Sequence, residues 1–470
     1  MLKHSVTVRA QLISQELRYK PANTRARGDP YPKKVYLQAV RKMIIVRVSC
    51  ILRTNLTVNH ASCRFGWCES SHVGHWMQID LKKKLRPANG ETLKALAVQS
   101  ALVLAKVRMS ALQPEEMKQP PIFSSTKLMQ LCGIERSRYQ YLLQQKGLPQ
   151  GTSRGNGRTR EFSLVETKEW LGFCRQFAGR PAGASGVVIS AANFKGGATK
   201  TTTTISLAQG LNLLYGHRVL VVDLDTQGSL TQLFGIIPNA HVEREQTAEA
   251  LFEGDESDLR YAVQRTYWPG LDLVAAGPAL YNAEFFLPSK AKDNPEFAFW
   301  DVLRSGLEPL RADYDVILLD TPPSLSYTTI NALMAADGIV VPIVPDPLDF
   351  ASSAQFWNLF DDIVNALSSY GLEKEYRFLN IVLSKVENSS HTVPVRGWLS
   401  ESYGNYVIPV EIPKTAVLGN SNAELKSVYD VSDYAGDAQT YTRAREAYDQ
   451  LVEYVHGEIE EIWADVKSGE

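Results

Sequence analysis

The sequence predicts an α/β protein whose larger part, residues 186–470, is a parallel β-sheet with helices on both faces. Short β-branched runs alternate there with segments of helical periodicity, which is typical of strands joined by helical crossovers. A segment of short helices and glycine turns precedes this part, so we expect a second, smaller domain before it. The predicted strands are Val187–Ala191, Val219–Asp223, Leu271–Ala275, Val316–Asp320, Gly338–Val344 and, as the last strand of the core, Asn380–Ser384.

The turn NFKGGATKTTTT, residues 193–204, links the first of these strands to a helix. Gly196 and Gly197 let backbone N–H groups approach a phosphate, and the positive end of the following helix faces the same point. Lys200 stands where a P-loop lysine reaches the β- and γ-phosphates, and Thr201 where a hydroxyl takes Mg²⁺. A glycine- and threonine-rich turn without a ligand is the alternative for this stretch alone. The motif favours a P-loop NTPase-like sheet with flanking helices.

The motif departs from the standard P-loop, because Phe194 and Thr199 stand at the places of its first glycine and of the glycine before the lysine. What remains is KGG-x-x-KT with an additional lysine, Lys195. This pattern resembles the deviant Walker A motif of the ParA/MinD superfamily of dimeric ATPases. The resemblance implies that ATP and Mg²⁺ occupy the loop, and that Lys195 reaches across a homodimer to the partner's nucleotide.

A second segment, DLDTQGSLT at residues 223–231, delivers Asp223 and Asp225 to the carboxyl end of an apolar strand, where ligands bind in open α/β sheets. Acidic residues also end strands simply because turns are polar. The segment is similar to the D-x-D-P-Q-x-x-x-T segment of the same family, with Thr226 at the proline position. By that resemblance Asp225 orients or activates the attacking water, and Gln227 belongs to the same polar cluster.

A third segment, VILLDTPPS at residues 316–324, is an apolar strand that ends in Asp320 and resembles a Walker B strand. The carboxylate of Asp320 is expected to hold Mg²⁺ through water. The turn at residues 321–324 matches the switch region of the family, and Pro345 after the next strand lies where relatives line the base.

The resemblance thus assigns the site residues. The catalytic residues are Lys195, Lys200 and Asp225. The metal is held by Thr201 and Asp320. The nucleotide contacts are Lys195, Gly196, Gly197, Ala198, Thr199, Lys200, Thr201, Thr202, Gln227 and Pro345.

Residues 1–76 form a basic extension. Residues 1–86 hold 17 Lys and Arg against four acidic residues, although the whole chain has 50 and 51. This arm could bind nucleic acid without sequence preference, could be disordered, or could come from an upstream start codon, with the natural protein beginning near Met77 or Met109. A zinc site at Cys63, Cys68, His72 and His75 is a further alternative, although their spacing fits no zinc pattern that we can place.

Residues 90–118 contain one long helix, with apolar residues at three- and four-residue steps over residues 91–112. A helix this apolar needs a partner. Packing against the next domain and dimerisation with a second helix are equally supported by the pattern.

Residues 119–180 are predicted to form a winged helix-turn-helix domain that binds DNA. A short helix, a turn at Gly133 and a second helix with basic residues are followed by a glycine-rich loop between two extended segments. This order places a recognition helix in a major groove and a wing on the phosphates. The alternative is a small helical cap whose arginines are merely solvated. The segment is similar to the DNA-binding domain of larger ParA proteins. The residues expected to contact DNA are Arg136, Arg138, Arg154, Arg158 and Arg160.

The C-terminal part, residues 376–430, also resembles the family, in which a loop and helix bind DNA without sequence preference. Candidates for this role are Lys385, Arg396, Lys414 and Lys426, for which ordinary surface charge is an equal alternative. The chain ends in an acidic amphipathic helix, whereas a membrane-surface helix is lysine-rich on its polar face.

Composition sets the remaining limits. The chain has no run of eighteen uncharged apolar residues, so we expect no membrane span. Five scattered cysteines in 470 residues fit a reducing cytoplasm better than a disulfide scaffold. The ATPase domain has no cysteine after Asp225, which disfavours an iron–sulfur relative.

These patterns together predict a ParA-type DNA-partition ATPase of the larger, helix-turn-helix-bearing class. By the resemblance, an ATP-bound homodimer binds nonspecific DNA on the nucleoid, a ParB-type centromere-binding protein stimulates slow hydrolysis, and the N-terminal domain binds the operator of its own operon. The alternatives are a nucleotide-gated transcriptional repressor and a ParA-like ATPase that positions a protein cargo.

Overall fold

A computed structural model of the chain divides into two units, residues 1–86 and 87–470, of which the second is described. The described residues are 89–468 without 113–117, 146, 155–158, 178, 369, 388, 416–425 and 432–436. The basic extension, including the zinc candidates Cys63, Cys68, His72 and His75, therefore lies outside the described residues.

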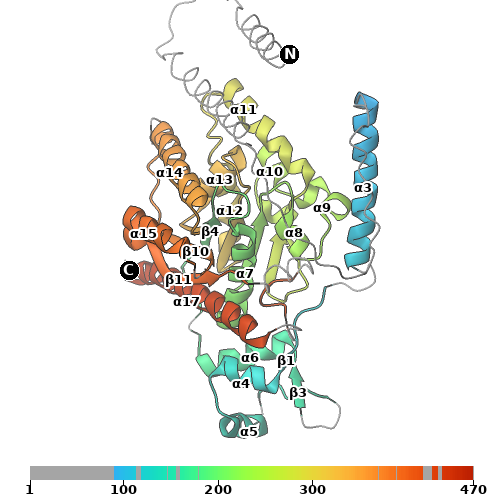
Figure 1. Cartoon of the computed structure of the whole chain (residues 1–470), viewed down its shortest axis with the longest axis vertical. Helices are drawn as coiled ribbons and strands as arrows, with labels where there is room; N and C mark the ends of the chain where they lie inside the picture. Colours follow the sequence, from blue (N-terminus) through green and yellow to red (C-terminus); the bar gives the residue numbers. More distant parts are fainter. Residues whose placement is uncertain are drawn as a thin grey trace, which may run out of the picture. The chain divides into compact units, whose positions relative to one another are not determined.

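The centre of the described chain is a β-sheet with the strand order β11-β10-β9-β4-β8-β5-β7-β6 (Figure 1). All neighbouring strands are parallel except β6 and β7, which are antiparallel. The parallel α/β fold predicted from the alternating pattern is confirmed. The strands are β4 (Val187–Ala191), β5 (Val219–Asp223), β6 (Gln264–Arg265), β7 (Leu271–Val274), β8 (Val316–Asp320), β9 (Gly338–Ile343), β10 (Phe378–Val386) and β11 (Val407–Pro413).

One prediction about the sheet is wrong, because Asn380–Ser384 is not the last strand. β11 follows it at the edge of the sheet and pairs with β10. Its residues alternate between buried and exposed, and it contains Pro409 and Pro413. Proline removes a ladder hydrogen bond, and an edge strand can tolerate that loss.

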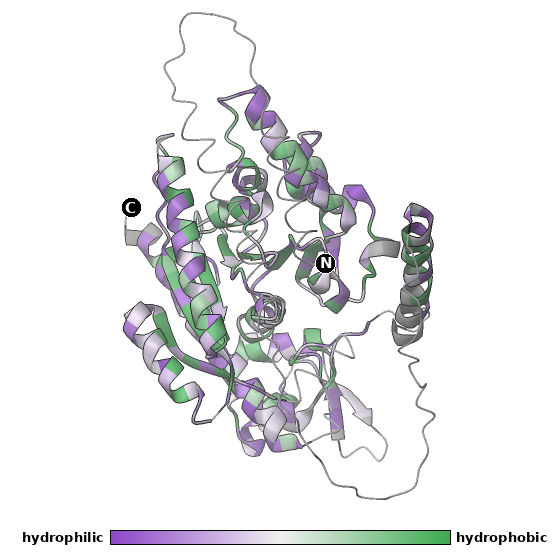
Figure 2. Cartoon of the chain, turned by 45° about the horizontal axis from the view of Figure 1, so that its top comes forward, coloured by the Kyte–Doolittle hydropathy of each residue, from purple (hydrophilic) through white to green (hydrophobic). Residues whose placement is uncertain are grey.

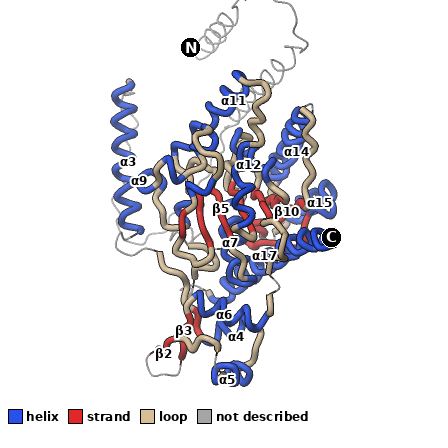
Figure 3. The backbone as a smooth tube through the Cα atoms, turned by 180° about the vertical axis from the view of Figure 1, so that it is seen from behind, coloured by secondary structure: helices blue, strands red, loops and turns tan. Residues whose placement is uncertain are grey.

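Helices cover both faces of the sheet (Figure 3). On one face, α7 (Lys200–Tyr215), α8 (Ser229–Leu233) and α17 (Ala438–Ser468) share a hydrophobic cluster with alternate strand residues such as Val187 and Ile189. The other face is covered by α10 (Glu249–Glu253), α11 (Ala283–Asp293), α12 (Val302–Leu307), α13 (Tyr327–Ala335), α14 (Pro347–Ser368) and α15 (Thr392–Tyr403). Because both faces are covered, β4, β5 and β8 are buried at every residue, as expected for a parallel sheet.

Short elements connect these layers. They are α9 (Pro238–His241) and the 3₁₀ turns η1 (Arg244–Gln246), η2 (Leu259–Ala262), η3 (Pro278–Asn282), η4 (Glu308–Ala312) and η5 (Gly404–Tyr406).

Residues 123–175 form a small domain around a three-stranded antiparallel sheet, with the order β1-β3-β2. Ser124 caps the first helix, which ends at Gly133 with φ +65°. Tyr139, Phe162 and Trp170 pack together in its core. The elements are β1 (Phe123–Ser124), α4 (Ser125–Cys132), α5 (Arg136–Gln144), β2 (Thr152–Arg154), β3 (Thr159–Phe162) and α6 (Leu164–Arg175). The domain shares its hydrophobic core with α7 and α17.

The long N-terminal helix is α3 (Gly90–Leu112). Its apolar residues are visible as green turns in Figure 2, among purple hydrophilic ones. Leu93 and Leu96 are about 60% exposed, so no described residue covers this part of the helix. Among the described residues, no helix is long and apolar enough to span a bilayer.

Candidate functional site

The turn between β4 and α7 has the backbone geometry of a phosphate-binding loop. Gly197 adopts φ +79° and Thr199 adopts φ +67°, and α7 begins immediately afterwards at Lys200. The side-chain oxygen of Asn193 accepts a hydrogen bond from the Lys195 amide at 2.9 Å, which fixes the start of the turn. The free N–H groups of the 16-residue helix α7 make its N-terminus attractive to an anion.

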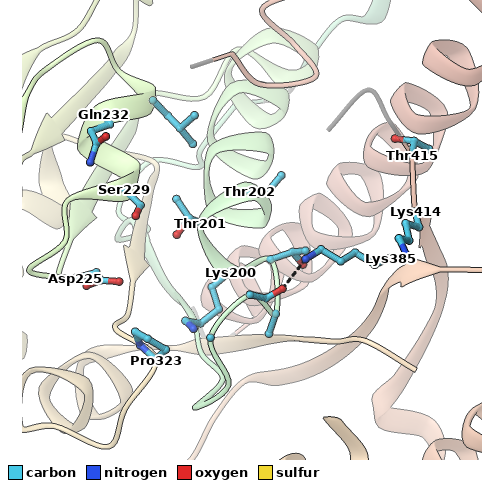
Figure 4. Close-up of a pocket in the computed structure, with 15 residues that line it drawn as sticks. Lys200, Thr201, Thr202, Asp225, Ser229, Gln232, Pro323, Lys385, Lys414 and Thr415 are labelled. Carbon is cyan, nitrogen blue, oxygen red and sulfur yellow. Dashed lines mark hydrogen bonds between the residues drawn. The ribbon is translucent and has the colours of Figure 1, made fainter. Parts of the chain in front are cut away.

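This turn lines a cavity of about 640 Å³. Figure 4 shows Asp225, Ser229 and Gln232 on one side of the start of α7, with Lys385, Lys414 and Thr415 on the other. The cavity is large enough for a nucleotide, since ligand pockets span about 300–1,000 Å³. Its lining residues are Gly196, Gly197, Ala198, Thr199, Lys200, Thr201, Thr202, Asp225, Ser229, Gln232, Leu233, Pro323, Lys385, Lys414 and Thr415.

The two lysines of the turn lie differently. Lys200 is buried and its ammonium donates to the Lys195 carbonyl at 3.3 Å. Burial lowers the pKa of Lys200, while the carboxylates of Asp320 and Asp225 favour its charged form. Lys195 instead pairs with Asp349 at the start of α14, with 2.6 Å between Nζ and Oδ2. Lys195 is therefore engaged within its own chain and does not line the cavity.

Carboxylates gather at the ends of the neighbouring strands β5 and β8. Asp223 and Asp320 are fully buried and lie opposite each other in the ladder. Thr201 donates its hydroxyl hydrogen to Asp320 Oδ2 at 2.8 Å, and Thr204 donates to Oδ1 at 3.0 Å. The register of two parallel strands thus brings the P-loop hydroxyl and the Walker B carboxylate into direct contact.

Burial raises the pKa of Asp320 to about 6, against the opposing effects of the Thr201 hydrogen bond and the Lys200 charge. The pKa of Asp223 is raised well above its ordinary value by burial and by the charge of Asp320. Two carboxylates without a counter-cation between them disfavour ionisation in each other. A divalent cation at this point would relieve that repulsion.

Asp225 follows on the same loop and lines the cavity. Its amide donates to Asp223 Oδ1 at 3.1 Å, and its own Oδ1 accepts from the Gln227 amide at 3.0 Å. The loop is therefore folded around its own carboxylates. Gln227 itself does not line the cavity.

The turn after β8 is fixed from two directions. Thr321 donates to the Ala191 carbonyl at 2.8 Å, and Pro323 lines the cavity. Glu284 of α11 accepts from the Tyr327 and Thr328 amides at 3.0 and 3.2 Å, so it caps the start of α13. A change in the conformation of the switch turn, residues 321–324, would therefore alter the positions of α11 and α13.

Sequence reasoning did not place Lys385 at the cavity. It is the one exposed residue of β10 and has φ +50°, where the pairing with β11 is irregular. Its ammonium donates to the Gly197 carbonyl of the P-loop at 2.8 Å. A non-glycine residue in the left-handed region is uncommon and often marks a functional position.

The neighbouring Lys414 pairs with Glu387 at 2.5 Å. Beside it, the buried Thr415 hydroxyl has no hydrogen-bond partner among the described residues.

The remaining predicted residues lie elsewhere. Pro345 is not among the residues that line the cavity. Arg136 and Arg138 lie in α5 and Arg154 in β2, while Arg158 lies outside the described residues. Arg160 in β3 donates to the Gln150 carbonyl at 2.6 Å. Arg396 pairs with Glu411 at 2.8 Å. Among the described residues, no three His, Cys, Asp or Glu side chains form a metal-binding group.

Comparisons with known proteins agree with this geometry. A family model described as an AAA domain matches residues 186–370. The chain is 32% identical over 231 residues to the chromosome partitioning protein ParA of Myxococcus xanthus. The matched region covers 48% of this chain and 75% of that protein. The chain is also 32% identical over 251 residues to the protein SopA of Escherichia coli. This matched region covers 52% of this chain and 63% of SopA. A solved structure described as a partition protein superposes with a TM-score of 0.56 at 18% identity, covering 79% of this chain and 98% of that one.

A parallel sheet of this kind, with a P-loop before the first sheet helix and an aspartate at the end of the neighbouring strand, defines a P-loop NTPase. The similarity to ParA over three quarters of that protein narrows the class further. The chain belongs to the ParA-type family of partition ATPases.

Proposed function

We propose that this chain binds ATP with Mg²⁺ in the cavity at the start of α7, hydrolyses it slowly, and uses the cycle to partition DNA. The observation that carries the proposal is the 2.8 Å contact between the Thr201 hydroxyl and the Asp320 carboxylate, next to a turn of left-handed glycine and threonine. A threonine and an aspartate that already meet offer two oxygen ligands, which is what Mg²⁺ prefers.

The residues present fit the metal. Thr201 and Asp320 would hold Mg²⁺, and the buried carboxylates of Asp223 and Asp320 make a cation there favourable. When bound, Mg²⁺ would neutralise charge on the phosphates. The amides of residues 196–202 and the ammonium of Lys200 would hold the phosphates themselves.

Hydrolysis in such a site depends on positioning and electrostatics. The oxygen of a water attacks the γ-phosphorus, and the bond from that phosphorus to the β–γ bridging oxygen breaks. ADP and phosphate leave, one proton of the water staying on the phosphate and the other being released. Asp225, which lines the cavity, orients the water. Lys200 stabilises the charge that develops on the phosphate oxygens.

Lys195 is the residue that would join two subunits. It pairs with Asp349 in its own chain, but its side chain is 31% exposed, so its ammonium can leave this partner at modest cost. In an ATP-bound homodimer, Lys195 would instead reach the partner's phosphates. Dimerisation would therefore exchange an intrachain ion pair for one across the interface.

The dimer would bind nonspecific DNA, and a ParB-type centromere-binding protein would stimulate hydrolysis and release it. Arg136 and Arg138 at the start of α5, with Arg154, Arg158 and Arg160 in the wing, would contact an operator. These DNA contacts would place the protein on the nucleoid.

A nucleotide-gated repressor is a second candidate, favoured by one contact. Lys168 of α6 donates to Asn212 at 3.0 Å, and Asn212 lies on α7, whose first residues line the cavity. The small domain is therefore attached to the same helix that would bind the phosphates.

The test measures ATP hydrolysis by the wild-type chain, Lys200→Ala and Lys195→Ala, with and without nonspecific DNA and the product of the gene immediately downstream. We expect slow wild-type turnover that rises several-fold with DNA and the partner. Lys200→Ala should lose hydrolysis by at least about 100-fold. Lys195→Ala should retain ATP binding but fail to dimerise in size-exclusion chromatography.

No hydrolysis by the wild-type chain under any condition, with operator binding intact, would exclude the partition cycle and leave the repressor. Dimerisation of Lys195→Ala equal to that of the wild type would contradict the role given to Lys195.

A further inference from the structure

Lys118 precedes the small domain in the sequence, but its side chain is buried against residues of the ATPase domain. Lys118 lies in the segment between α3 and β1, and its side chain is only 15% exposed. Its ammonium donates to the Leu233 carbonyl at 2.6 Å and to Asp430 Oδ2 at 2.9 Å. It also lies 4.5 Å from the centre of the Tyr267 ring. The segment that leads to the small domain is thus anchored by a buried charge.

The groups around Lys118 come from distant parts of the chain. Asp430 also accepts from the Tyr267 hydroxyl at 2.5 Å and from the Ser427 amide at 2.8 Å. Gln209 of α7 donates to the same tyrosine at 2.8 Å. Burial lowers the pKa of Lys118, while Asp430 favours its charged form. Because a buried charge is costly without partners, this arrangement is specified rather than incidental.

The important partner is Leu233, because it is the last residue of α8 and lines the nucleotide cavity. α8 has five residues, so its last carbonyls have no partner within the helix. Thr231, the middle residue of α8, donates from its amide at 2.9 Å and its hydroxyl at 2.7 Å to Asp223. The short helix is therefore held between an aspartate of the carboxylate cluster and the linker lysine.

The approach of the linker to α8 is close. A Cβ atom added at Gly235, which follows α8 with φ +82°, would lie 3.3 Å from the Cβ of Lys118. The linker therefore lies directly against the turn that ends α8. A shift of α8 on nucleotide binding would displace Lys118 and the linker with it.

We propose that Lys118 is a positioning residue that couples α8 in the ATP cavity to the linker of the small domain. This proposal rests on the proposed function, because ATP is the ligand that would move α8. Lys118 touches neither the nucleotide nor the reacting atoms; it acts through the Leu233 carbonyl. Loss of its charge should uncouple the linker from the nucleotide while ATP still binds.

The test uses the full chain with Lys118→Met, which keeps most of the length of the side chain and removes its charge. Lys168→Met is the matched control, because Lys168 also links the small domain to the ATPase domain, donating to Asn212 at 3.0 Å and to the Pro269 carbonyl at 3.2 Å. Both of these hydrogen-bond partners lie outside α8. Hydrogen exchange is measured by mass spectrometry for residues 118–124 and 226–236, with and without AMP-PNP and Mg²⁺, alongside AMP-PNP affinity and ATP turnover.

In the wild type and in Lys168→Met, AMP-PNP should slow exchange in both segments. In Lys118→Met, AMP-PNP affinity should stay within about threefold and residues 226–236 should still respond, but the response of residues 118–124 should be lost. The kcat of Lys118→Met should change at least threefold with little change in KM. Asp430→Asn, which keeps an acceptor oxygen, should give the same pattern more weakly and serves if Lys118→Met does not fold.

An unchanged response of residues 118–124 in Lys118→Met or, if that variant does not fold, in Asp430→Asn would overturn the coupling, as would an equal loss in Lys168→Met. Both results leave ATP binding intact and so leave the proposed function standing. Failure of the wild-type chain to bind AMP-PNP would overturn the proposed function and the coupling together.

Discussion

The two sides of the nucleotide cavity are built in opposite ways. The carboxylate side consists of Asp223, Asp225 and Asp320 at the ends of β5 and β8, and Asp223 and Asp320 are fully buried. The lysine side consists of Lys385, Lys414 and Thr415 at the ends of β10 and β11. Lys385 is exposed on an irregular strand with φ +50°.

This difference indicates where the binding free energy is concentrated. Charges interact strongly where solvent is excluded and weakly where water screens them. The carboxylate side is also fixed by the strand ladder, whereas the lysine side depends on a bulged strand and an edge strand. We therefore expect substitutions on the carboxylate side to abolish activity and those on the lysine side to adjust affinity.

The largest effect is expected from Asp320→Asn. The amide removes the charge that would hold Mg²⁺, so hydrolysis should fall by at least about 100-fold. Hydrolysis is measured over a range of Mg²⁺ concentrations, with Asp272→Asn as a control, because Asp272 lies on β7 away from the cavity and pairs with Tyr314 at 2.7 Å. A loss below tenfold would mean that the carboxylate side does not hold the metal.

The same substitution should raise stability without nucleotide in a pH-dependent way. Burial raises the pKa of Asp320 to about 6, so the folded state holds its proton more tightly than the unfolded state does. The group therefore stabilises the fold below its unfolded pKa, near 4, and that contribution is lost as pH rises toward 6.

Asp320→Asn lacks this loss, so its melting temperature relative to the wild type should increase from pH 4 to pH 6 in metal-free buffer. At about 1.4 kcal/mol per pKa unit, this pH-dependent increase is at most about 3 kcal/mol. One weakened hydroxyl contact lowers the stability of the variant by about 1 kcal/mol at every pH and leaves the increase unchanged. A constant difference across this range would show that Asp320 is not the group whose ionisation opposes folding.

On the lysine side, Lys385→Met should weaken ATP binding about three- to tenfold, since exposed charge interactions contribute about 1 kcal/mol. Its stem would still cover the cavity, but the contact with the Gly197 carbonyl would be lost. Titration with a fluorescent ATP analogue measures the affinity. Lys414→Met is the matched control and should change it less, because Glu387 already neutralises Lys414. A larger loss of ATP affinity in Lys414→Met than in Lys385→Met would assign the main contact with ATP to Lys414.

The carboxylate side could be predicted from the sequence, and the lysine side could not. Runs of buried apolar residues that end in Asp223 and Asp320 identify both a strand and its ligand, because a parallel sheet brings the carboxyl ends of its strands to one edge. β11 has no such run, and its two prolines argue against a strand in the sequence.

The contact of Lys385 with Gly197 joins residues 188 positions apart, which no local pattern encodes. For the same reason Lys385 was predicted as a candidate for nonspecific DNA binding, with ordinary surface charge as the equal alternative, and not as a neighbour of the P-loop. Lys118 was missed as well, because a lone lysine in a linker gives no signal until its partners at Leu233 and Asp430 are known.

The smallest effect is expected at Thr199, which lies between the two sides at the start of α7. A β-branched residue at φ +67° carries strain of about 1–3 kcal/mol, and its buried hydroxyl has no hydrogen-bond partner within the described part of the chain. Thr199→Gly relieves both but makes the unfolded chain more flexible, which costs up to about 1 kcal/mol. We therefore expect a net stabilisation of about 1 kcal/mol in thermal unfolding, with ATP affinity changed less than by Lys385→Met. Thr199→Ala separates the two causes, since it removes the hydroxyl and keeps the strained Cβ. Stability equal to that of the wild type in both variants would mean that the turn is not strained. A threonine at the position of the P-loop glycine would then not lower the stability of this protein.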